Sequence, residues 1–320
     1  MAESRFNADE LFMKAKAGDR RSLGRLVTMI ESGYFKTAEA NKAILKFDSN
    51  TILVGITGSP GAGKSTLTSQ LIGSIRKSDK TVAVIAIDPS SPFTGGAILG
   101  DRIRMGEHAM DSGVYIRSLA TRGQLGGLSA AVPEVVKLMS SLGFDFIVVE
   151  TVGVGQVEVE IVGQADTTVV VVNPGWGDSV QANKAGLMEI ADIFVINKAD
   201  RPGAQETARD LKSMLELSQS MAWLPPICQT IGTDGTGVQD LLDEILRHRQ
   251  YLVDSGILNQ KVFSRTKNEL LSLVNENILN RATTYVDSVE GSDLIKSIIE
   301  GSDDIAGAAE TLFTMIVKGL

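Results

Sequence analysis

The chain has 320 residues and a formal net charge of −8. Its length and its ordinary apolar and charged fractions, 43% and 22%, allow one large globular domain with appendages. An acidic chain has a long-range field of the wrong sign to attract nucleic acid or an anionic membrane, so we expect neither as a main partner.

The cysteine content and the apolar runs predict a cytoplasmic protein. Cys228 is the single cysteine and cannot form an intrachain disulfide, and polar residues rather than a signal-peptide core follow Met1. The most apolar runs, such as residues 168–172, are far shorter than the ~20 residues that a membrane-spanning helix needs. We therefore expect no transmembrane segment.

Residues 1–48 predict a helical N-terminal extension. Asp19 and Ser22 are candidate helix caps. The apolar residues at helical spacing are Leu23, Leu26, Val27 and Ile30.

Residues 49–250 predict an α/β domain. Short β-branched apolar runs alternate with segments of helical length, which is typical of strands buried on both faces. We therefore expect a mostly parallel sheet covered by helices. The runs are residues 52–56, 82–87, 146–149, 168–172, 193–196 and 227–230.

A phosphate-loop motif, G-x-x-x-x-G-K-[ST], follows the first of these strands. Its residues are Gly58, Ser59, Pro60, Gly61, Ala62, Gly63, Lys64, Ser65 and Thr66. Glycines let the backbone N–H groups point at phosphate oxygens, and the helix that follows presents its positive end to the same anion. We expect Lys64 to reach the β and γ phosphates and Ser65 to ligate Mg²⁺. A glycine-rich turn that matches by chance is disfavoured by the strand before it and the helix after it.

Two later segments predict that the base is guanine. Asn197, Lys198, Ala199 and Asp200 form an N-K-x-D element after the strand at 193–196. The Asp200 carboxylate can accept hydrogen bonds from guanine N1 and N2, whereas adenine offers no such donor pair, so GTP is favoured over ATP. Thr230, Ile231 and Gly232 lie at the end of the last strand, where GTPases place a loop whose backbone touches the base; a plain exit from the strand is the alternative.

The metal site is predicted around Glu150. Glu150 and Gly153 belong to a D-x-x-G-like element with Glu in place of Asp. Glu150 can hold Mg²⁺ through water, and the Gly153 N–H can contact the γ phosphate. Asp88 and Asp101 are candidates to complete the metal site or to orient the attacking water, although each could instead be a cap or a surface ion pair. The predicted catalytic residues are Lys64, Asp101 and Glu150.

Residues 251–320 predict a helical C-terminal arm with three apolar stripes. The stripes could pack on the chain's own nucleotide-binding domain or on a second subunit, so the arm is a possible dimerisation element.

Three long motifs resemble one family of GTPases. They are DPSSPFTGGAILGDRIRM at residues 88–105, RSLATRG at 117–123 and ETVGVGQ at 150–156. They are similar to those of the MeaB/ArgK/MMAA family, GTPases that serve as chaperones of adenosylcobalamin-dependent methylmalonyl-CoA mutase. The similarity runs from about residue 8 to residue 260. It implies a homodimer in which GTP binding and hydrolysis gate cofactor loading and protect the mutase, with cobalamin reached only through the partner.

In that family the stretch matching residues 174–186 is an additional switch loop that communicates with the mutase. The candidate residues for this role are Trp176, Asp178, Gln181 and Lys184. A Gly-Trp-Gly turn after a buried strand is flexible and carries one large apolar side chain, which either a nucleotide or a partner could order. The alternative is that Trp176 only covers the edge of the sheet.

Other functions fit the sequence less well or stay open. A nickel-insertion GTPase needs soft or imidazole ligands, and the chain has only His108, His248 and Cys228. A kinase of periplasmic transport proteins would require preference for ATP and an exported acceptor, which Asp200 and the N-terminus disfavour. A regulatory GTPase for another partner and a binding module with negligible hydrolysis stay open, because GTPases of this type can be slow until a partner completes the site.

Overall fold

The computed structural model describes residues 7–33, 47–89, 106–121, 131–151, 165–175, 189–217 and 222–318. The chain divides into two compact units, one ending at Leu258 and the other beginning at Asn259. Each unit is described by itself below.

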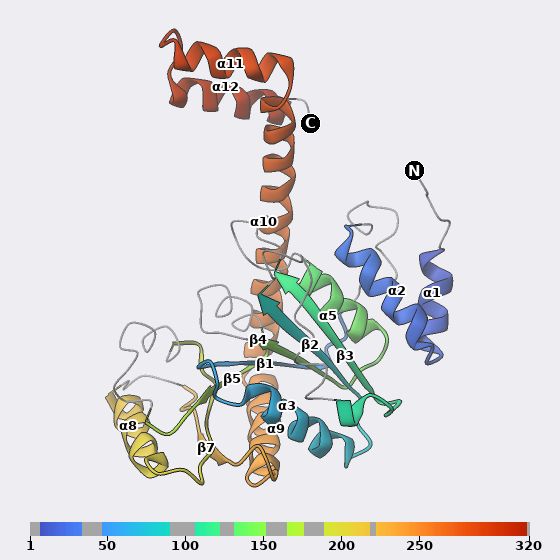
Figure 1. Ribbon diagram of the computed structural model, residues 1–320, viewed down its shortest axis with the longest axis vertical. Coiled ribbons are helices and arrows are strands. Elements are labelled where there is room, and N and C mark those ends of the chain that lie inside the picture. The colour runs from blue at the N-terminus through green and yellow to red at the C-terminus, as the bar shows by residue number, and fades with distance from the viewer. Residues whose placement is uncertain are drawn as a thin grey trace. The chain divides into compact units, whose positions relative to one another are not determined.

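The first unit is built on a sheet with strand order β3-β2-β4-β1-β5-β6-β7, in which every described pairing is parallel (Figure 1). The strands are β1 (Ile52–Gly58), β2 (Val82–Pro89), β3 (Val114–Thr121), β4 (Phe146–Thr151), β5 (Thr167–Val172), β6 (Ile193–Asn197) and β7 (Ile227–Thr230). All six apolar runs of the sequence are strands, so the predicted α/β fold with a mostly parallel sheet is confirmed. Because the strands are parallel, their carboxyl ends meet at one edge, where α/β proteins bind ligands.

Strand β3 (Val114–Thr121) was not predicted. It pairs only with β2, at the end of the strand order. Its sequence, VYIRSLAT, mixes apolar and polar residues, and the side chains from Tyr115 to Ser118 are only partly buried. The continuous apolar signal of an inner strand is therefore missing from this edge strand.

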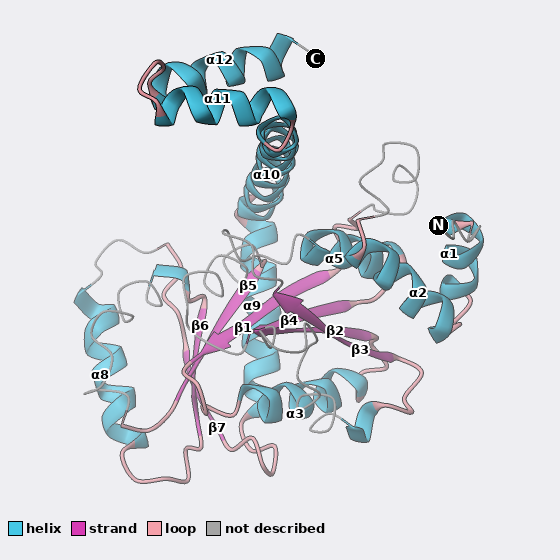
Figure 2. Ribbon diagram, turned by 45° about the horizontal axis from the view of Figure 1, so that its top comes forward, coloured by secondary structure: helices cyan, strands magenta, loops and turns pink. Residues whose placement is uncertain are grey.

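Helices cover both faces of the sheet (Figure 2). On one face lie α3 (Lys64–Arg76) and α9 (Val238–Asp254), which place Leu67, Leu71, Leu241 and Ile245 against strand side chains. On the other face lie four more helices from the described part of this unit, because their apolar side chains join clusters formed by the alternate residues of the same strands. These helices are α1 (Ala8–Lys16), α2 (Arg20–Glu31), α5 (Ala131–Ser141) and α8 (Ala204–Leu217).

Helix α2 begins where the sequence predicts a cap. Asp19 is the N-cap of α2, and its side chain accepts hydrogen bonds from the backbone N–H groups of Arg21 and Ser22. The Ser22 hydroxyl donates to the same carboxylate at 2.6 Å. These hydrogen bonds hold the pKa of Asp19 below its usual range because they favour the charged form. Ser22 therefore supports the cap and is not the cap itself.

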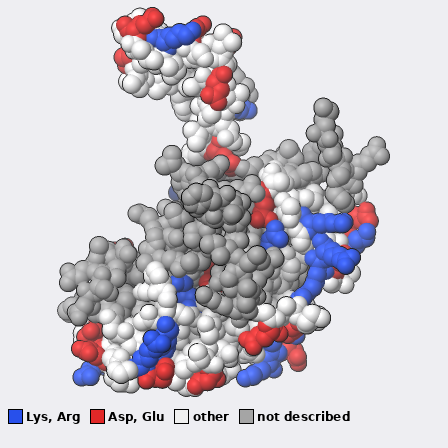
Figure 3. Space-filling view, in the orientation of Figure 1, with Lys and Arg blue, Asp and Glu red and all other residues white. Residues whose placement is uncertain are grey.

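The second unit is helical, as predicted. It contains α10 (Ile257–Val286) from its third residue onward, together with α11 (Val289–Ile299) and α12 (Ile305–Lys318). Helix α10 contains no buried residue. Much of the surface of this unit is neither acidic nor basic (Figure 3). Large apolar side chains that are more than half exposed are Phe263, Leu270, Leu279, Val289, Ile299, Ile305, Phe313 and Met315. Among the described residues, no helix is both long and apolar enough to cross a bilayer.

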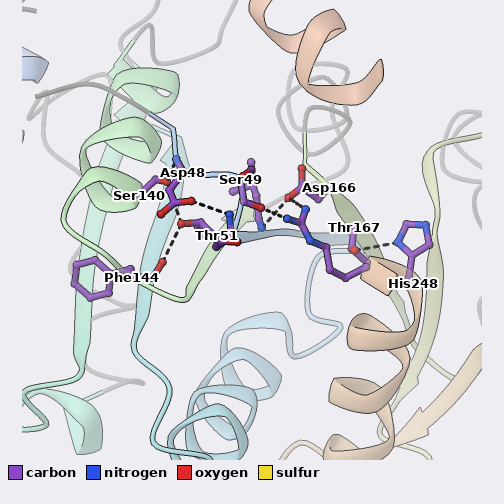
Figure 4. Close-up of polar contacts among 11 residues, drawn as sticks. Asp48, Ser49, Thr51, Ser140, Phe144, Asp166, Thr167 and His248 are labelled. Atoms are coloured by element: carbon purple, nitrogen blue, oxygen red, sulfur yellow. Dashed lines mark hydrogen bonds and ion pairs between the residues drawn. The ribbon is translucent and has the colours of Figure 1, made fainter. Parts of the chain in front are cut away.

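A row of polar contacts holds helix α9 to the amino edge of the sheet (Figure 4). Arg249 forms an ion pair with the buried Asp166 at 2.8 Å and also donates to the Ser49 carbonyl. Asp166 accepts a further bond from the Leu53 N–H at 3.2 Å, and His248 Nδ1 lies 2.9 Å from the Thr167 hydroxyl. A buried carboxylate needs such partners because leaving water costs several kcal/mol.

We predict that Arg249→Ala lowers the free energy of unfolding by about 3–5 kcal/mol, because it removes the cation that faces a fully buried carboxylate. Arg247→Ala is the matched control on the same helix. Its side chain is 58% exposed and pairs with Glu244, so its loss should cost about 1 kcal/mol. Urea denaturation followed by circular dichroism measures both. Equal costs would contradict the structural role given to the buried pair.

Candidate nucleotide-binding site

The turn between β1 and α3 holds the predicted phosphate loop. β1 ends at Gly58 and α3 begins at Lys64. Two glycines are required by geometry: Gly58 has φ of +139° and Gly63 has φ of +85°. A Cβ atom at Gly58 would lie 1.9 Å from the Val171 carbonyl oxygen, and one at Gly63 would lie 2.5 Å from Asn197 Nδ2. The loop can therefore approach its neighbours only with glycine at these positions.

Lys64 is held inside the curve of this loop. The residue is 6% exposed, and its Nζ donates to the carbonyl oxygens of Gly58 at 2.8 Å and Ser59 at 3.1 Å. Lys64 is also the first residue of α3, whose free backbone N–H groups carry partial positive charge. A lysine ammonium and a helix N-terminus together make a site for phosphate.

Ser65 and Glu150 lie in direct contact beside the loop. The Ser65 hydroxyl donates to Glu150 Oε1 at 2.6 Å, and both residues are buried. The pairing of β1 with β4 produces this contact, since it places Ile56 opposite Glu150. Hydroxyl and carboxylate oxygens are the hard donors that Mg²⁺ prefers, so this pair fits a magnesium ion.

Asn197 joins three loops at the carboxyl edge of the sheet. Its side chain is nearly fully buried, and its Nδ2 donates to the Ala62 carbonyl at 2.7 Å. Its Oδ1 accepts from the Gly232 N–H at 3.0 Å and from the Thr230 hydroxyl at 3.1 Å. One carboxamide therefore fixes the phosphate loop against the N-K-x-D turn and against the loop that follows β7.

The residues after Asn197 make further hydrogen bonds between the same three loops. Lys198 has φ of +60°, and its Nζ donates to the Gly61 carbonyl at 2.6 Å. The Ala199 N–H donates to the Thr230 carbonyl at 3.0 Å. Asp200, the last residue of the N-K-x-D turn, is exposed, so its carboxylate is accessible to a base.

The structure thus brings together most of the predicted site at one edge of the sheet. The phosphate loop, Glu150, the N-K-x-D turn and the loop at 230–232 all meet there. Asp88 is described only by its backbone, at the end of β2. Six predicted residues lie outside the described part of the chain: Asp101, Gly153, Trp176, Asp178, Gln181 and Lys184.

The bridging role of Asn197 could not be read from the sequence. The N-K-x-D pattern marked Asn197 as a nucleotide residue, but its partners lie 135 residues before it and 35 residues after it. A local pattern carries no information about such partners. The direct contact between Ser65 and Glu150 was missed for the same reason, since 85 residues separate them.

We predict that Asn197→Ala weakens binding of GDP by about 100-fold. The substitution removes three buried hydrogen bonds worth about 1 kcal/mol each, and 1.4 kcal/mol corresponds to a tenfold change in affinity. Titration with a fluorescent GDP analogue measures the dissociation constant. The control is Asn50→Ala, an exposed asparagine at the opposite edge of the sheet, which should bind as tightly as the unmodified protein. Unchanged affinity in Asn197→Ala would show that the three loops do not depend on this side chain.

A phosphate loop between β1 and α3, fixed by an asparagine to an N-K-x-D turn after β6, defines the protein as a P-loop GTPase, an enzyme that hydrolyses GTP. The family model for "Methylmalonyl Co-A mutase-associated GTPase MeaB" matches residues 23–287. The chain belongs to this family.

Individual proteins are similar to this chain in sequence or in fold. A protein of Pyrococcus abyssi that is named as a GTPase is 47% identical over 315 residues, which cover 97% of each chain. GTPase ArgK of Escherichia coli is 34% identical over 280 residues, which cover 85% of each chain. A crystal structure of a LAO/AO transport system kinase shares the fold, with a TM-score of 0.71 at 23% identity over 99% of each chain.

Proposed function

We propose that this GTPase is a chaperone of methylmalonyl-CoA mutase. GTP binding and hydrolysis gate the loading of adenosylcobalamin and protect the mutase from inactivation, and cobalamin is contacted only through the partner. The observation that carries the proposal is the match of residues 23–287 to a family named for its association with that mutase.

The proposed hydrolysis uses the residues at the carboxyl edge of the sheet. Lys64 neutralises charge on the β and γ phosphates, and the phosphate-loop N–H groups orient them. Ser65 and Glu150 hold Mg²⁺, which when bound offsets the charge that develops on the phosphate oxygens. The Gly153 N–H contacts the γ phosphate. Asp88 and Asp101 complete the metal site or orient the water that attacks the γ phosphorus.

The base is proposed to be read by the turn after β6 and the loop after β7. Asp200 accepts hydrogen bonds from guanine N1 and N2, and Lys198 supports the phosphate loop through Gly61. The backbone from Thr230 to Gly232 lies against the base, in a position that is fixed by the bonds to Asn197.

We predict that Asp200→Asn shifts nucleotide preference from GTP toward xanthosine triphosphate by about tenfold or more, because the xanthine edge is complementary to a carboxamide. Competition titrations with the two nucleotides measure the ratio of dissociation constants. Asp210→Asn, the same change at an exposed position on α8, is the control and should keep the normal ratio. If Asp200→Asn also keeps it, Asp200 does not read the base.

The protein is proposed to act as a homodimer joined by its C-terminal helices. The second unit exposes Phe263, Val289, Ile299 and Ile305 by 72%, 76%, 78% and 73% respectively. Side chains of this size, exposed in one small helical unit, favour burial against another protein surface. A second copy of the same unit would supply an equally apolar surface.

The segment with Trp176, Asp178, Gln181 and Lys184 is proposed to face the mutase.

Two other functions receive less support. For a metal-delivery GTPase, Cys228 is a poor ligand, since burial raises the pKa of its thiol to about 12 and a thiol must lose its proton to bind metal. His248 is buried and contacts Thr167, which also disfavours it as a ligand. A transport-linked kinase would need ATP, which the N-K-x-D turn disfavours. A regulatory GTPase for a different partner is the remaining alternative.

The deciding experiment is GTP hydrolysis by the purified protein with and without methylmalonyl-CoA mutase, with ATP in place of GTP as a control. We expect slow hydrolysis of GTP by the protein alone and an acceleration of about tenfold or more with the mutase, because partners commonly complete GTPase sites. Lys64→Ala should abolish turnover under both conditions. GTP hydrolysis that does not respond to the mutase would overturn the proposed partner and leave the GTPase intact.

A further inference from the structure

Two threonine hydroxyls meet at the carboxyl ends of β1 and β4. The Thr151 hydroxyl donates to Thr57 Oγ1 at 3.0 Å, and Thr151 Oγ1 also lies 3.5 Å from the Ile56 carbonyl oxygen. Both threonines are fully buried. They are 94 residues apart in the chain, so this hydrogen bond joins two strands that are distant in sequence.

The bond extends the pairing of β1 with β4 by one residue. The described register of these two strands ends with Ile56 opposite Glu150. Thr57 and Thr151 are the next residue of each strand. Side-chain hydroxyls therefore hold the two strands together directly beyond this last backbone pair.

This position lies between two parts of the nucleotide site. Thr57 directly precedes Gly58, whose carbonyl oxygen accepts a hydrogen bond from Lys64 Nζ at 2.8 Å. Thr151 directly follows Glu150, the carboxylate that is proposed to hold Mg²⁺. The bond between the threonines thus joins the residue before the phosphate loop to the residue after the metal-binding carboxylate.

The two hydroxyls lie on the face of the sheet opposite to the Glu150 carboxylate. Successive side chains of a strand point to alternate faces, so Thr57 and Thr151 point away from the face that carries Glu150 and helix α3. Val149 and Ile87, which neighbour Thr151 on its own face, belong to the apolar cluster that includes side chains of α2 and α5. An effect of the threonines on Glu150 is therefore transmitted through the backbone.

The apolar surroundings show that filling the core does not require hydroxyl groups here. Valine has the shape of threonine and would occupy this layer without polar atoms. Buried hydroxyls cost free energy unless they are hydrogen-bonded, and replacing both partners of a buried bond by apolar groups of the same shape is close to neutral. What the hydroxyl pair adds is a directional bond, which fixes the separation of the two strand ends.

We propose that Thr57 and Thr151 are positioning residues, which hold Glu150 at the distance from the phosphate loop that lets Mg²⁺ and the nucleotide phosphates bind together. The proposal rests on the proposed metal role of Glu150. Because the metal ion in such sites contacts both the protein and the phosphate oxygens, a change in this distance weakens the coupling between metal and nucleotide. Nucleotide binding without metal is changed little.

Binding of GDP with and without Mg²⁺ measures this coupling in the absence of turnover. Dissociation constants for a fluorescent GDP analogue are determined in EDTA and in excess Mg²⁺, and the ratio of the two is the gain from the metal. We expect a gain in the unmodified protein and its loss in Glu150→Gln. Thr151→Val should reduce the gain by about fivefold, the change that one net hydrogen bond produces, while its affinity in EDTA stays within about twofold.

Conservative and double variants separate positioning from folding. Thr151→Ser keeps the hydroxyl and should keep the gain. Thr57→Val/Thr151→Val removes both polar groups, so its urea midpoint should be close to that of the unmodified protein while its gain is as low as that of Thr151→Val. Thr167→Val is the matched control, because it removes an equally buried threonine contact, to His248, at the amino ends of the strands, and it should keep the full gain.

The outcomes distinguish this proposal from the one on which it rests. If Mg²⁺ strengthens GDP binding equally in the unmodified protein and in the valine variants of Thr57 and Thr151, the positioning role is wrong and Glu150 keeps its proposed role. Equal losses of the gain in Thr151→Val and Thr167→Val would also overturn the positioning role, because they would reflect a general loss of stability. If Mg²⁺ gives no gain in the unmodified protein, or if Glu150→Gln keeps the full gain, the proposed metal site is wrong and the positioning role fails with it.

Discussion

The site depends on one buried carboxamide. Asn197 donates to the phosphate loop through Ala62 and accepts from the loop after β7 through Thr230 and Gly232. The phosphate end and the base end of a nucleotide site are built from segments far apart in the chain, and here the same side chain is hydrogen-bonded to both. The glycine at position 63 is part of this arrangement, because any larger residue would collide with the Asn197 amide.

The parallel sheet makes this convergence possible. Its inner strands are apolar on both faces, so helices must cover each face, and each loop that follows a strand emerges at the same edge. The polar contacts at the opposite edge of the sheet are structural. There Arg249 pairs with the buried Asp166 and donates to the Ser49 carbonyl, and these contacts hold α9 in place. The nucleotide site thus lies at the carboxyl ends of the strands, and the contacts that hold α9 lie at their amino ends.

The chain belongs to the mutase-associated GTPase family, and its nucleotide site lies at the carboxyl edge of the sheet. Helix α8 begins shortly after the N-K-x-D turn, and its Thr207 hydroxyl accepts a hydrogen bond from the Gly175 N–H. Both segments leave adjacent strands, β5 and β6, at the same edge of the sheet.

Local patterns in the sequence determined the elements and the chemistry of the motifs. Continuous β-branched runs identified the inner strands, helical spacing identified both appendages, and the glycines and Lys64 identified the phosphate loop, because each of these signals arises within a few residues. The tertiary structure alone decided which distant groups meet: Ser65 with Glu150, Asn197 with Ala62, and Thr207 with Gly175. It also revealed β3, whose half-buried edge position leaves no continuous apolar run. Such partners depend on strand order and register, which no local periodicity encodes.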